Sequence, residues 1–261
     1  MAVGSGLAAW HFTHIGSAHA FEIVAAAVLA AVAQVLRVEG ATAHSSYEIS
    51  WVVFGFTFVM YGASATLFVV LVAHLVEWIW HTHQKRWFIF AFNVSSFAIV
   101  ISAADLARQW VTAVPAAIGW EDVLSLILAA AAFTLLNHLM IGLVLWFARG
   151  EPIHQSGVMG RLTLMIDFST FGLGMAAALT WLVHPLAVVL ILAPLYLIYS
   201  TLRVPALERQ TQIDAKTGLF NARYFNDALE KELARADRHD RPLVVVMADL
   251  DLLRNINNTY G

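Results

Sequence analysis

The sequence predicts an α-helical integral membrane bundle of about six transmembrane helices, followed by the start of a cytoplasmic α/β domain. The first observation is composition: 60% of the 261 residues are hydrophobic, 13% are charged and the mean hydropathy is +0.71, which excludes an ordinary soluble domain. The second is charge distribution, since residues 1–200 hold 6 Lys or Arg and 9 Asp or Glu, whereas the much shorter remainder holds 9 of each. We therefore divide the chain into a membrane domain (1–202), a helical connector (203–213) and a small polar domain (214–261).

Six apolar runs are long enough to cross about 30 Å of hydrocarbon, which takes about 20 helical residues. They lie near residues 16–36, 49–80, 87–107, 123–148, 162–183 and 186–202. The second run is too long for one straight crossing, and we expect its aromatic end at the membrane interface. The last two are separated only by His184-Pro185, which favours a tight hairpin.

The basic residues of the short loops predict an orientation, because Lys and Arg accumulate on the cytoplasmic side. In a six-span model, five of these basic residues lie on one side of the membrane and two lie on the other. The larger group is Lys85, Arg86, Arg149, Arg161 and Arg203, and the smaller is Arg37 and Arg108. Both termini are then expected in the cytoplasm.

Several polar side chains interrupt the apolar runs, and each needs a reason because a polar group without a partner in hydrocarbon is costly. They are Glu22, Asn93, Ser95, Ser96, Asp105, Asn137, His138 and Asp167. One interpretation is that they bond between helices and fix their packing, helped by small residues such as Gly55, Gly62 and Gly174 that allow close approach. The other is that Asn93, Asn137, His138 and Asp167 line a sensor pocket for a small ligand or a proton.

Two groups of histidines raise the question of a metal or haem site. One comprises His11, His14, His19 and Glu22, and the other His74, Glu77, His81 and His83. Imidazoles three or four residues apart on a helix can share a metal, but neither group matches a specific ligand motif, so we do not expect metal or haem there. The absence of cysteine excludes thiolate sites. A net charge of −3 without a basic cluster beyond Lys85-Arg86 argues against nucleic acid as a partner.

The polar domain begins with a turn that contains Gly218. An amphipathic helix is predicted over residues 222–236, and the apolar run 243–248 is typical of a buried strand. That run ends in Asp249-Leu250-Asp251. Two carboxylates at a strand end could hold Mg²⁺ together with nucleotide phosphates, or could instead cap the following helix.

Three segments of this domain resemble the opening of the GGDEF domain of diguanylate cyclases. They are Asp214-x-x-Thr217-Gly218-Leu219-x-Asn221-x-Arg223-x-Phe225, Arg235-Ala236-x-Arg238 and Asp249-Leu250-Asp251-x-Leu253-Arg254-x-Ile256-Asn257-Asn258-x-x-Gly261. The resemblance covers about the last 48 residues, roughly the first third of such a domain. It departs from the family pattern at Lys216, Phe220, Leu253 and Asn258.

This resemblance implies roles for individual residues. Asp249 and the backbone of Leu250 would bind Mg²⁺, Asn257 would contact the guanine of GTP, and Arg254 would lie near the phosphates. The G-G-[DE]-E-F signature of the family is not among these residues. We therefore expect no complete catalytic site in this chain, and whether the protein is an enzyme is left open.

The membrane half is similar to multi-span sensor modules that precede such domains in bacterial signalling proteins. The similarity rests on Arg86-Trp87, Phe92-Asn93, Asn137 and Arg149-Gly150. It implies a bacterial inner-membrane protein, in contact with lipid and forming a homodimer, whose sensor domain binds an unknown small ligand and controls the synthesis of cyclic di-GMP from two GTP. Alternatives are a binding or structural subunit of a larger membrane complex with a vestigial GGDEF remnant, and a small-molecule transporter.

Overall fold

The computed structural model describes residues 2–16, 18–36, 38–39, 46–80, 87–111, 119–150, 152–154, 156–210, 213–214 and 217–248. Contacts divide the chain into two compact units, Met1–Ala206 and Leu207–Gly261.

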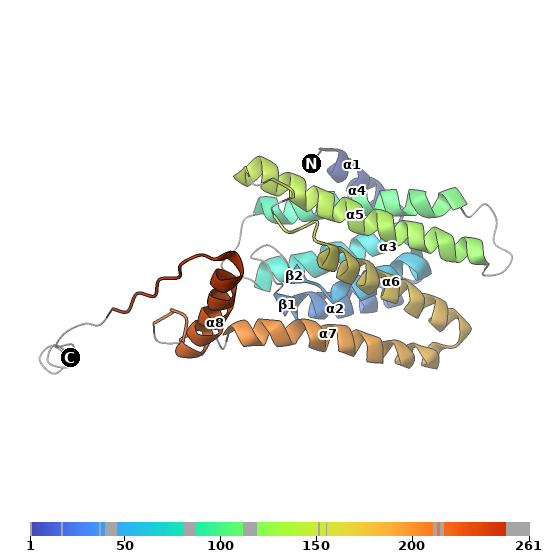
Figure 1. Cartoon of the computed structure of the whole chain (residues 1–261). Helices are drawn as coiled ribbons and strands as arrows, with labels where there is room; N and C mark the ends of the chain where they lie inside the picture. The colour runs from blue at the N-terminus through green and yellow to red at the C-terminus, as the bar shows by residue number, and fades with distance from the viewer. Residues whose placement is uncertain are drawn as a thin grey trace, which may run out of the picture. The chain divides into compact units, whose positions relative to one another are not determined.

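The first unit is a helical bundle with one short β-hairpin (Figure 1). Its elements are α1 (Ala2–Thr13), α2 (Ala20–Val35), β1 (Val38–Glu39), β2 (Ser46–Tyr47), α3 (Ser50–Trp80), α4 (Trp87–Val111), α5 (Trp120–Arg149), α6 (Arg161–Val183), the 3₁₀ turn η2 (Pro185–Val188) and α7 (Val189–Gln210). The two strands pair antiparallel, Val38 opposite Tyr47. Helix α3 packs against α2, α4 and α6, and α4 packs against α5.

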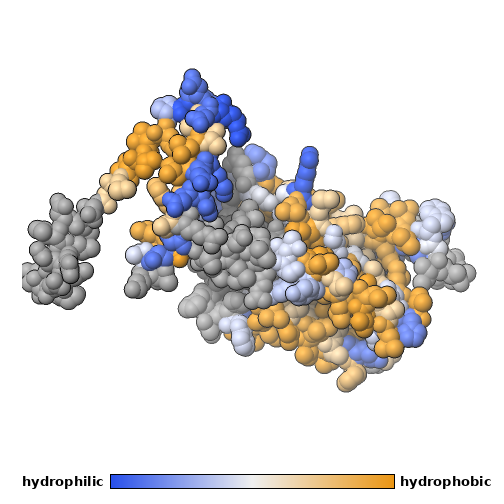
Figure 2. Space-filling view, turned by 60° about the horizontal axis from the view of Figure 1, so that its bottom comes forward, coloured by the Kyte–Doolittle hydropathy of each residue, from blue (hydrophilic) through white to orange (hydrophobic). Residues whose placement is uncertain are grey.

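Among the described residues, four helices suit a membrane crossing by length and composition: α3, when counted across its kink at Gly62, and α4, α5 and α6. Helix α2 and residues 185–201 are shorter apolar helices. Large apolar side chains lie on the outside of the bundle, with Phe21 83% exposed and Phe147 78% exposed, and Figure 2 shows apolar residues over much of one face. Exposed apolar surface of this extent is expected where lipid covers it. The structure thus supports membrane association, but it does not reproduce the predicted six full-length spans.

Helix α3 reverses direction at Gly62, where φ is +81° and ψ is −180°. The side chain of Gln34 demonstrates this reversal. It accepts a hydrogen bond from the Ser50 hydroxyl at one end of α3, and it donates one to Glu77 Oε2, 3.1 Å away, near the other end. A straight helix would hold Ser50 and Glu77 about 40 Å apart, at 1.5 Å per residue. Residues 50–61 and 63–80 therefore form two arms that run back along each other, joined at a glycine because this backbone conformation favours one.

The reversal corrects the predicted arrangement of the loops. Six spans place loop 36–49 and loop 81–86 on opposite sides of the membrane. In the structure, the end of α2, the start of α3 and the end of α3 meet at Gln34, so the elements that flank these two loops gather at one end of the bundle. Hydropathy does not detect a turn inside an uninterrupted apolar run, and this is why the prediction failed.

The predicted first span, near residues 16–36, corresponds to the shorter helix α2. Residues 2–13, which precede it, form a separate helix that the sequence did not predict. Helix α1 packs along α4. Ser5 Oγ lies 3.3 Å from Ser95 Oγ, and His11 bonds to Ser64 Oγ at 3.0 Å and Ser102 Oγ at 2.9 Å. These contacts give Ser95 the interhelical packing role that was one of its two interpretations.

The core of the bundle is aromatic, and α3 approaches α6 closely beside it. Phe54, Phe58, Phe133 and Phe171 are fully buried, and the rings of Phe133 and Phe171 stack with centroids 4.0 Å apart. A Cβ atom on Gly55 would overlap the carbonyl oxygen of Phe171, and one on Gly174 would overlap that of Val52. Gly55 and Gly174 therefore let the two backbones touch, as the small residues predicted.

In the second unit, the predicted turn and helix are confirmed. Gly218 has φ +69°, and Asp214 Oδ1 accepts hydrogen bonds from the backbone N–H and the hydroxyl of Thr217, at 2.9 and 3.0 Å. Helix α8 (Ala222–His239) follows, and the Asn221 side chain caps it by accepting a bond from the Tyr224 N–H at 3.0 Å. Helix α7 ends at Gln210, within the predicted connector, and the connector itself stays a prediction.

The buried strand predicted over residues 243–248 is not formed. These residues have no regular secondary structure, and Val244, Val246 and Met247 are exposed. A strand requires a partner for its hydrogen bonds, and no described residue supplies one to this segment. The α/β class of this unit therefore stays a prediction.

Candidate functional site

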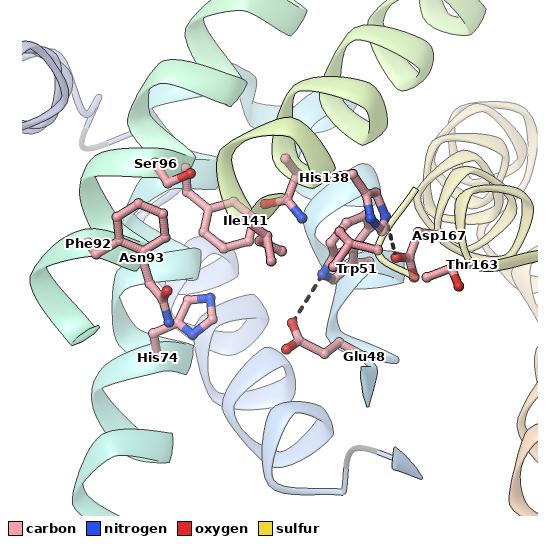
Figure 3. Close-up of a pocket in the computed structure, with 13 residues that line it drawn as sticks. Glu48, Trp51, His74, Phe92, Asn93, Ser96, His138, Ile141, Thr163 and Asp167 are labelled. Atoms are coloured by element: carbon pink, nitrogen blue, oxygen red, sulfur yellow. Dashed lines mark hydrogen bonds and ion pairs between the residues drawn. The ribbon is translucent and has the colours of Figure 1, made fainter. Parts of the chain in front are cut away.

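A cavity of about 110 Å³ lies within the bundle, between α3, α4, α5 and α6 (Figure 3). It is lined by Glu48, Trp51, His74, Phe92, Asn93, Ser96, Phe97, Asn137, His138, Ile141, Val158, Thr163 and Asp167. The structure thus brings together Asn93, Asn137, His138 and Asp167, the four residues assigned from the sequence to a sensor pocket. That they bind a ligand stays a prediction.

On one wall, His138 of α5 pairs with Asp167 of α6. Nε2 of His138 lies 2.8 Å from Oδ2 of Asp167, and both side chains are more than nine-tenths buried. The other ring nitrogen, Nδ1 of His138, is buried and has no partner among the described residues. With an ionised Asp167, Nε2 carries the proton and donates it, which leaves Nδ1 of the neutral ring as an acceptor.

His74 of α3 forms a second histidine–carboxylate pair. Its Nδ1 lies 3.2 Å from Oε2 of Glu77, and the same oxygen accepts a bond from Gln34. Because Oε2 already accepts from an amide, we assign the proton of the His74 bond to Nδ1. Nε2 of His74 is buried, and no residue that the structure describes bonds to it. In both pairs, a carboxylate accepts a hydrogen bond from one ring nitrogen of the histidine, and the other ring nitrogen remains as an acceptor.

Glu48 precedes α3 and reaches the cavity from the end where α2 and α3 meet. Its Oε2 accepts a hydrogen bond from Nε1 of Trp51 at 3.1 Å. Burial raises the pKa of the Glu48 carboxyl, and the nearby charge of Glu77 raises it further, while His74 and the bonds from Gln34 and Trp51 oppose the shift. Glu48 therefore keeps its proton to a higher pH in the folded protein than in an unfolded chain.

This shift predicts a pH dependence of stability. The folded state binds more protons than the unfolded state between the ordinary pKa of a glutamate and the raised one, so stability falls as pH rises through that window. The Glu48→Gln variant, which cannot ionise, should lose this part of the decline. Thermal unfolding of both proteins in detergent at a series of pH values measures it, and parallel curves would contradict the assignment.

The rest of the lining combines aromatic walls with polar groups. Trp51, Phe92 and Phe97 line the cavity, and so does Ser96, whose buried hydroxyl has no partner in the described part of the chain. Five buried side-chain atoms lack a partner in the described part of the chain, and three of them belong to residues that line this cavity: His74, Ser96 and His138. Buried polar atoms of native proteins are normally bonded. Water or a polar ligand is needed in the cavity to complete their hydrogen bonds.

The histidine groups considered for metal are dispersed in the structure. His11 bonds to two serines, His14 to the backbone oxygen of Trp10 at 2.7 Å, and His19 lies 3.8 Å from Glu22. Among the residues that the structure describes, no three histidines, cysteines, aspartates or glutamates gather as metal ligands. His81 and His83 lie outside the described residues.

Sequence reasoning missed Glu48, Trp51 and His74 as members of this site. Glu48 belongs to a predicted loop, and His74 was grouped with the histidines that follow it along the chain. Only the reversal of α3 at Gly62 brings residues 48–51 beside His74. The signal in the sequence was the excessive length of the second apolar run.

The residues assigned to Mg²⁺ and GTP cannot be placed in the same way. Asp249, the backbone of Leu250, Arg254 and Asn257 all lie outside the described residues. Of the segments that carry the GGDEF resemblance, the structure describes the Asp214–Thr217 hydrogen bonds, the Gly218 turn and α8. The Mg²⁺ and GTP assignments stay predictions.

Comparisons with known proteins concern the C-terminal part of the chain. Residues 211–261 match the family model of the diguanylate cyclase GGDEF domain. The chain is also 32% identical over 72 residues to diguanylate cyclase DgcS of Shewanella oneidensis, an alignment that covers 28% of this chain and 23% of that protein. No solved structure matches the chain. The C-terminal residues thus contain a segment similar to GGDEF domains, and the N-terminal region contains helices suited to a membrane.

Proposed function

We propose that this chain is part of a bacterial membrane signalling protein in which a helical sensor domain controls the synthesis of cyclic di-GMP. The observation that carries the proposal is the order of the two parts: a GGDEF-family match over residues 211–261 follows directly on an apolar bundle that encloses a polar cavity. A cavity with unsatisfied polar atoms gives the bundle a means to receive a signal. The GGDEF segment gives the signal an output.

The proposed reaction joins two GTP molecules. The 3′-hydroxyl of each GTP attacks the α-phosphate of the other, and two pyrophosphates leave. Mg²⁺ would supply charge neutralisation at the phosphates when bound. In this proposal Asp249 and the backbone of Leu250 hold the metal, Arg254 lies near the phosphates and Asn257 binds the guanine. Because each domain binds one GTP, the active form is a homodimer with two facing half-sites.

The proposed place is the inner membrane, with both termini in the cytoplasm. The ends of α2 and α3 that meet at Gln34 flank two loops. One loop contains Arg37, and the other contains Lys85 and Arg86. In this proposal the two loops lie with the elements that flank them, on the same side as Arg149 at the end of α5 and Arg161 at the start of α6, and Arg108 lies on the opposite side. The positive-inside rule then assigns the Gln34 end to the cytoplasm more firmly than six spans did.

Cysteine labelling tests this orientation, and the absence of native cysteine makes the experiment clean. A cysteine in place of Gly119 should react with an impermeant maleimide in spheroplasts. Cysteines in place of Ser46 and His154 should react only after the membrane is permeabilised. Reaction of the Ser46 position from outside, with His154 still protected, would instead restore the six-span arrangement.

The function itself is tested by measuring cyclic di-GMP. The full-length protein is produced in a bacterium whose own diguanylate cyclases have been deleted, and the nucleotide is quantified in extracts by mass spectrometry. We expect accumulation above the empty-vector level. An unchanged level, with the protein present in the membrane fraction, would contradict the proposed output.

A further inference from the structure

We infer that the cavity between α3, α4, α5 and α6 binds a small organic cation that carries N–H donors, of the class of a protonated amine or a guanidinium. This inference names the ligand class of the proposed sensor and rests on that function only for its signalling role. Binding itself follows from the charge, the hydrogen bonds and the walls of the cavity.

The charge of the cavity favours a cation. Glu48 and Asp167 contribute carboxyls to the lining, and Glu77 stands directly behind His74. None of the lining residues that the structure describes is a lysine or an arginine. Asp167 faces a His138 ring that is neutral in the tautomer assigned above, so this partner does not balance the charge of its carboxylate. Buried negative charge in an apolar bundle is costly unless a cation accompanies it.

The hydrogen bonds favour a ligand that donates. Both imidazoles use one N–H toward a carboxylate, so Nε2 of His74 and Nδ1 of His138 present lone pairs. The Ser96 hydroxyl can accept as well, and Asn93 and Asn137 add amide oxygens to the lining. Each is an acceptor suited to an ammonium or guanidinium N–H. A ligand that only accepts, such as a carboxylate ion, would meet both lone pairs and carboxylates and be repelled.

The walls and the size of the cavity restrict the ligand further. Trp51 and Phe92 line the cavity beside polar side chains (Figure 3), and Phe97 lines it as well. Aromatic faces attract organic cations more strongly than neutral solutes. A volume of about 110 Å³ admits a compact molecule rather than a nucleotide or a lipid headgroup. Water alone would satisfy the lone pairs, but it would not balance the Asp167 carboxylate.

Equilibrium dialysis of the full chain in detergent tests the inference. The probes are radiolabelled methylammonium and guanidinium, with propionate as an anionic control of similar size. We expect saturable binding of at least one cation and none of propionate. Asp167→Asn, which keeps the shape of the side chain but removes its charge, should weaken cation binding at least about tenfold, and Ser96→Ala should weaken it less.

Asp105→Asn is the matched control, because Asp105 is another bundle aspartate that pairs with Arg108 at 3.0 Å and does not line the cavity. Its cation affinity should equal that of the unmodified protein. The inference is overturned if folded protein binds neither cation saturably, if propionate binds equally well, or if Asp105→Asn weakens binding as much as Asp167→Asn. Thermal unfolding confirms that each variant is folded. Dialysis requires no nucleotide synthesis, so its failure is distinct from a failure of the proposed cyclase function.

Discussion

Gly174→Ala is expected to disrupt the bundle, whereas Gly172→Ala two residues away is expected to leave it intact. A methyl group on Gly174 overlaps the backbone oxygen of Val52 on the facing helix, and that oxygen cannot rotate away as a side chain would. The α3 and α6 backbones must separate, which removes packing around the stacked rings of Phe133 and Phe171. Overpacking typically lowers the free energy of unfolding by about 1–3 kcal/mol. We expect a loss at the upper end of this range or above it, because the backbone must move.

Gly172 lies on the same helix as Gly174 but has different surroundings. No atom lies within 4 Å of the position that a Cβ on Gly172 would take, so the added methyl group meets open space. Gly55→Ala, on the opposite side of the same contact, should behave like Gly174→Ala because its Cβ meets the Phe171 oxygen. Thermal unfolding and size-exclusion profiles in detergent measure both effects. Equal melting temperatures for the Gly172 and Gly174 variants would show that the two backbones do not touch as described.

Asp249→Ala in the full-length protein is expected to reduce cyclic di-GMP to background, a loss of more than about 100-fold. The change removes a proposed Mg²⁺ ligand and with it the charge neutralisation at the α-phosphate. Quantification of the nucleotide in a cyclase-deleted strain gives the readout, with membrane-fraction immunoblots to confirm equal amounts of protein.

Asp227→Ala serves as its control, because Asp227 is an exposed carboxylate on α8 in the same segment. That variant should retain synthesis. Undiminished cyclic di-GMP from the Asp249 variant would end the metal assignment, and equal loss from both variants would indicate general damage to the domain rather than loss of a ligand.

Much of the bundle could be predicted from the sequence, because the cost of exposing backbone in hydrocarbon leaves few options to an apolar run. Helices α4, α5 and α6 lie close to where the runs 87–107, 123–148 and 162–183 placed them. The four polar residues assigned to a pocket share one cavity for a related reason. Groups such as Asp167 and His138 avoid lipid, so they turn inward and meet.

The unpredicted features depend on information that periodicity does not contain. Gly62 stands in an apolar run that also holds Gly55, and one of them reverses the chain while the other permits a close contact. Their sequence surroundings do not distinguish the two roles. Helix α1 was missed because it is short and its anchors, His11 and Ser5, bond to residues more than fifty positions away. The run 243–248 has the composition of a strand, but composition does not supply a neighbouring strand.

The ends of α2 and α3 lie together beside Gln34, and this arrangement has a consequence for what the protein could monitor. His74 lies six residues before the end of α3, while Asn93 and Asp167 each lie six residues after the start of their helices, a depth of about 9 Å at 1.5 Å per residue. A solute that arrives from this face passes less than two helical turns of protein, whereas one from the opposite face must traverse the aromatic core. In the proposed orientation, the short route opens from the cytoplasm. The receptor would then report on the cell's own metabolic state, on the same side of the membrane as its output, rather than on the surrounding medium.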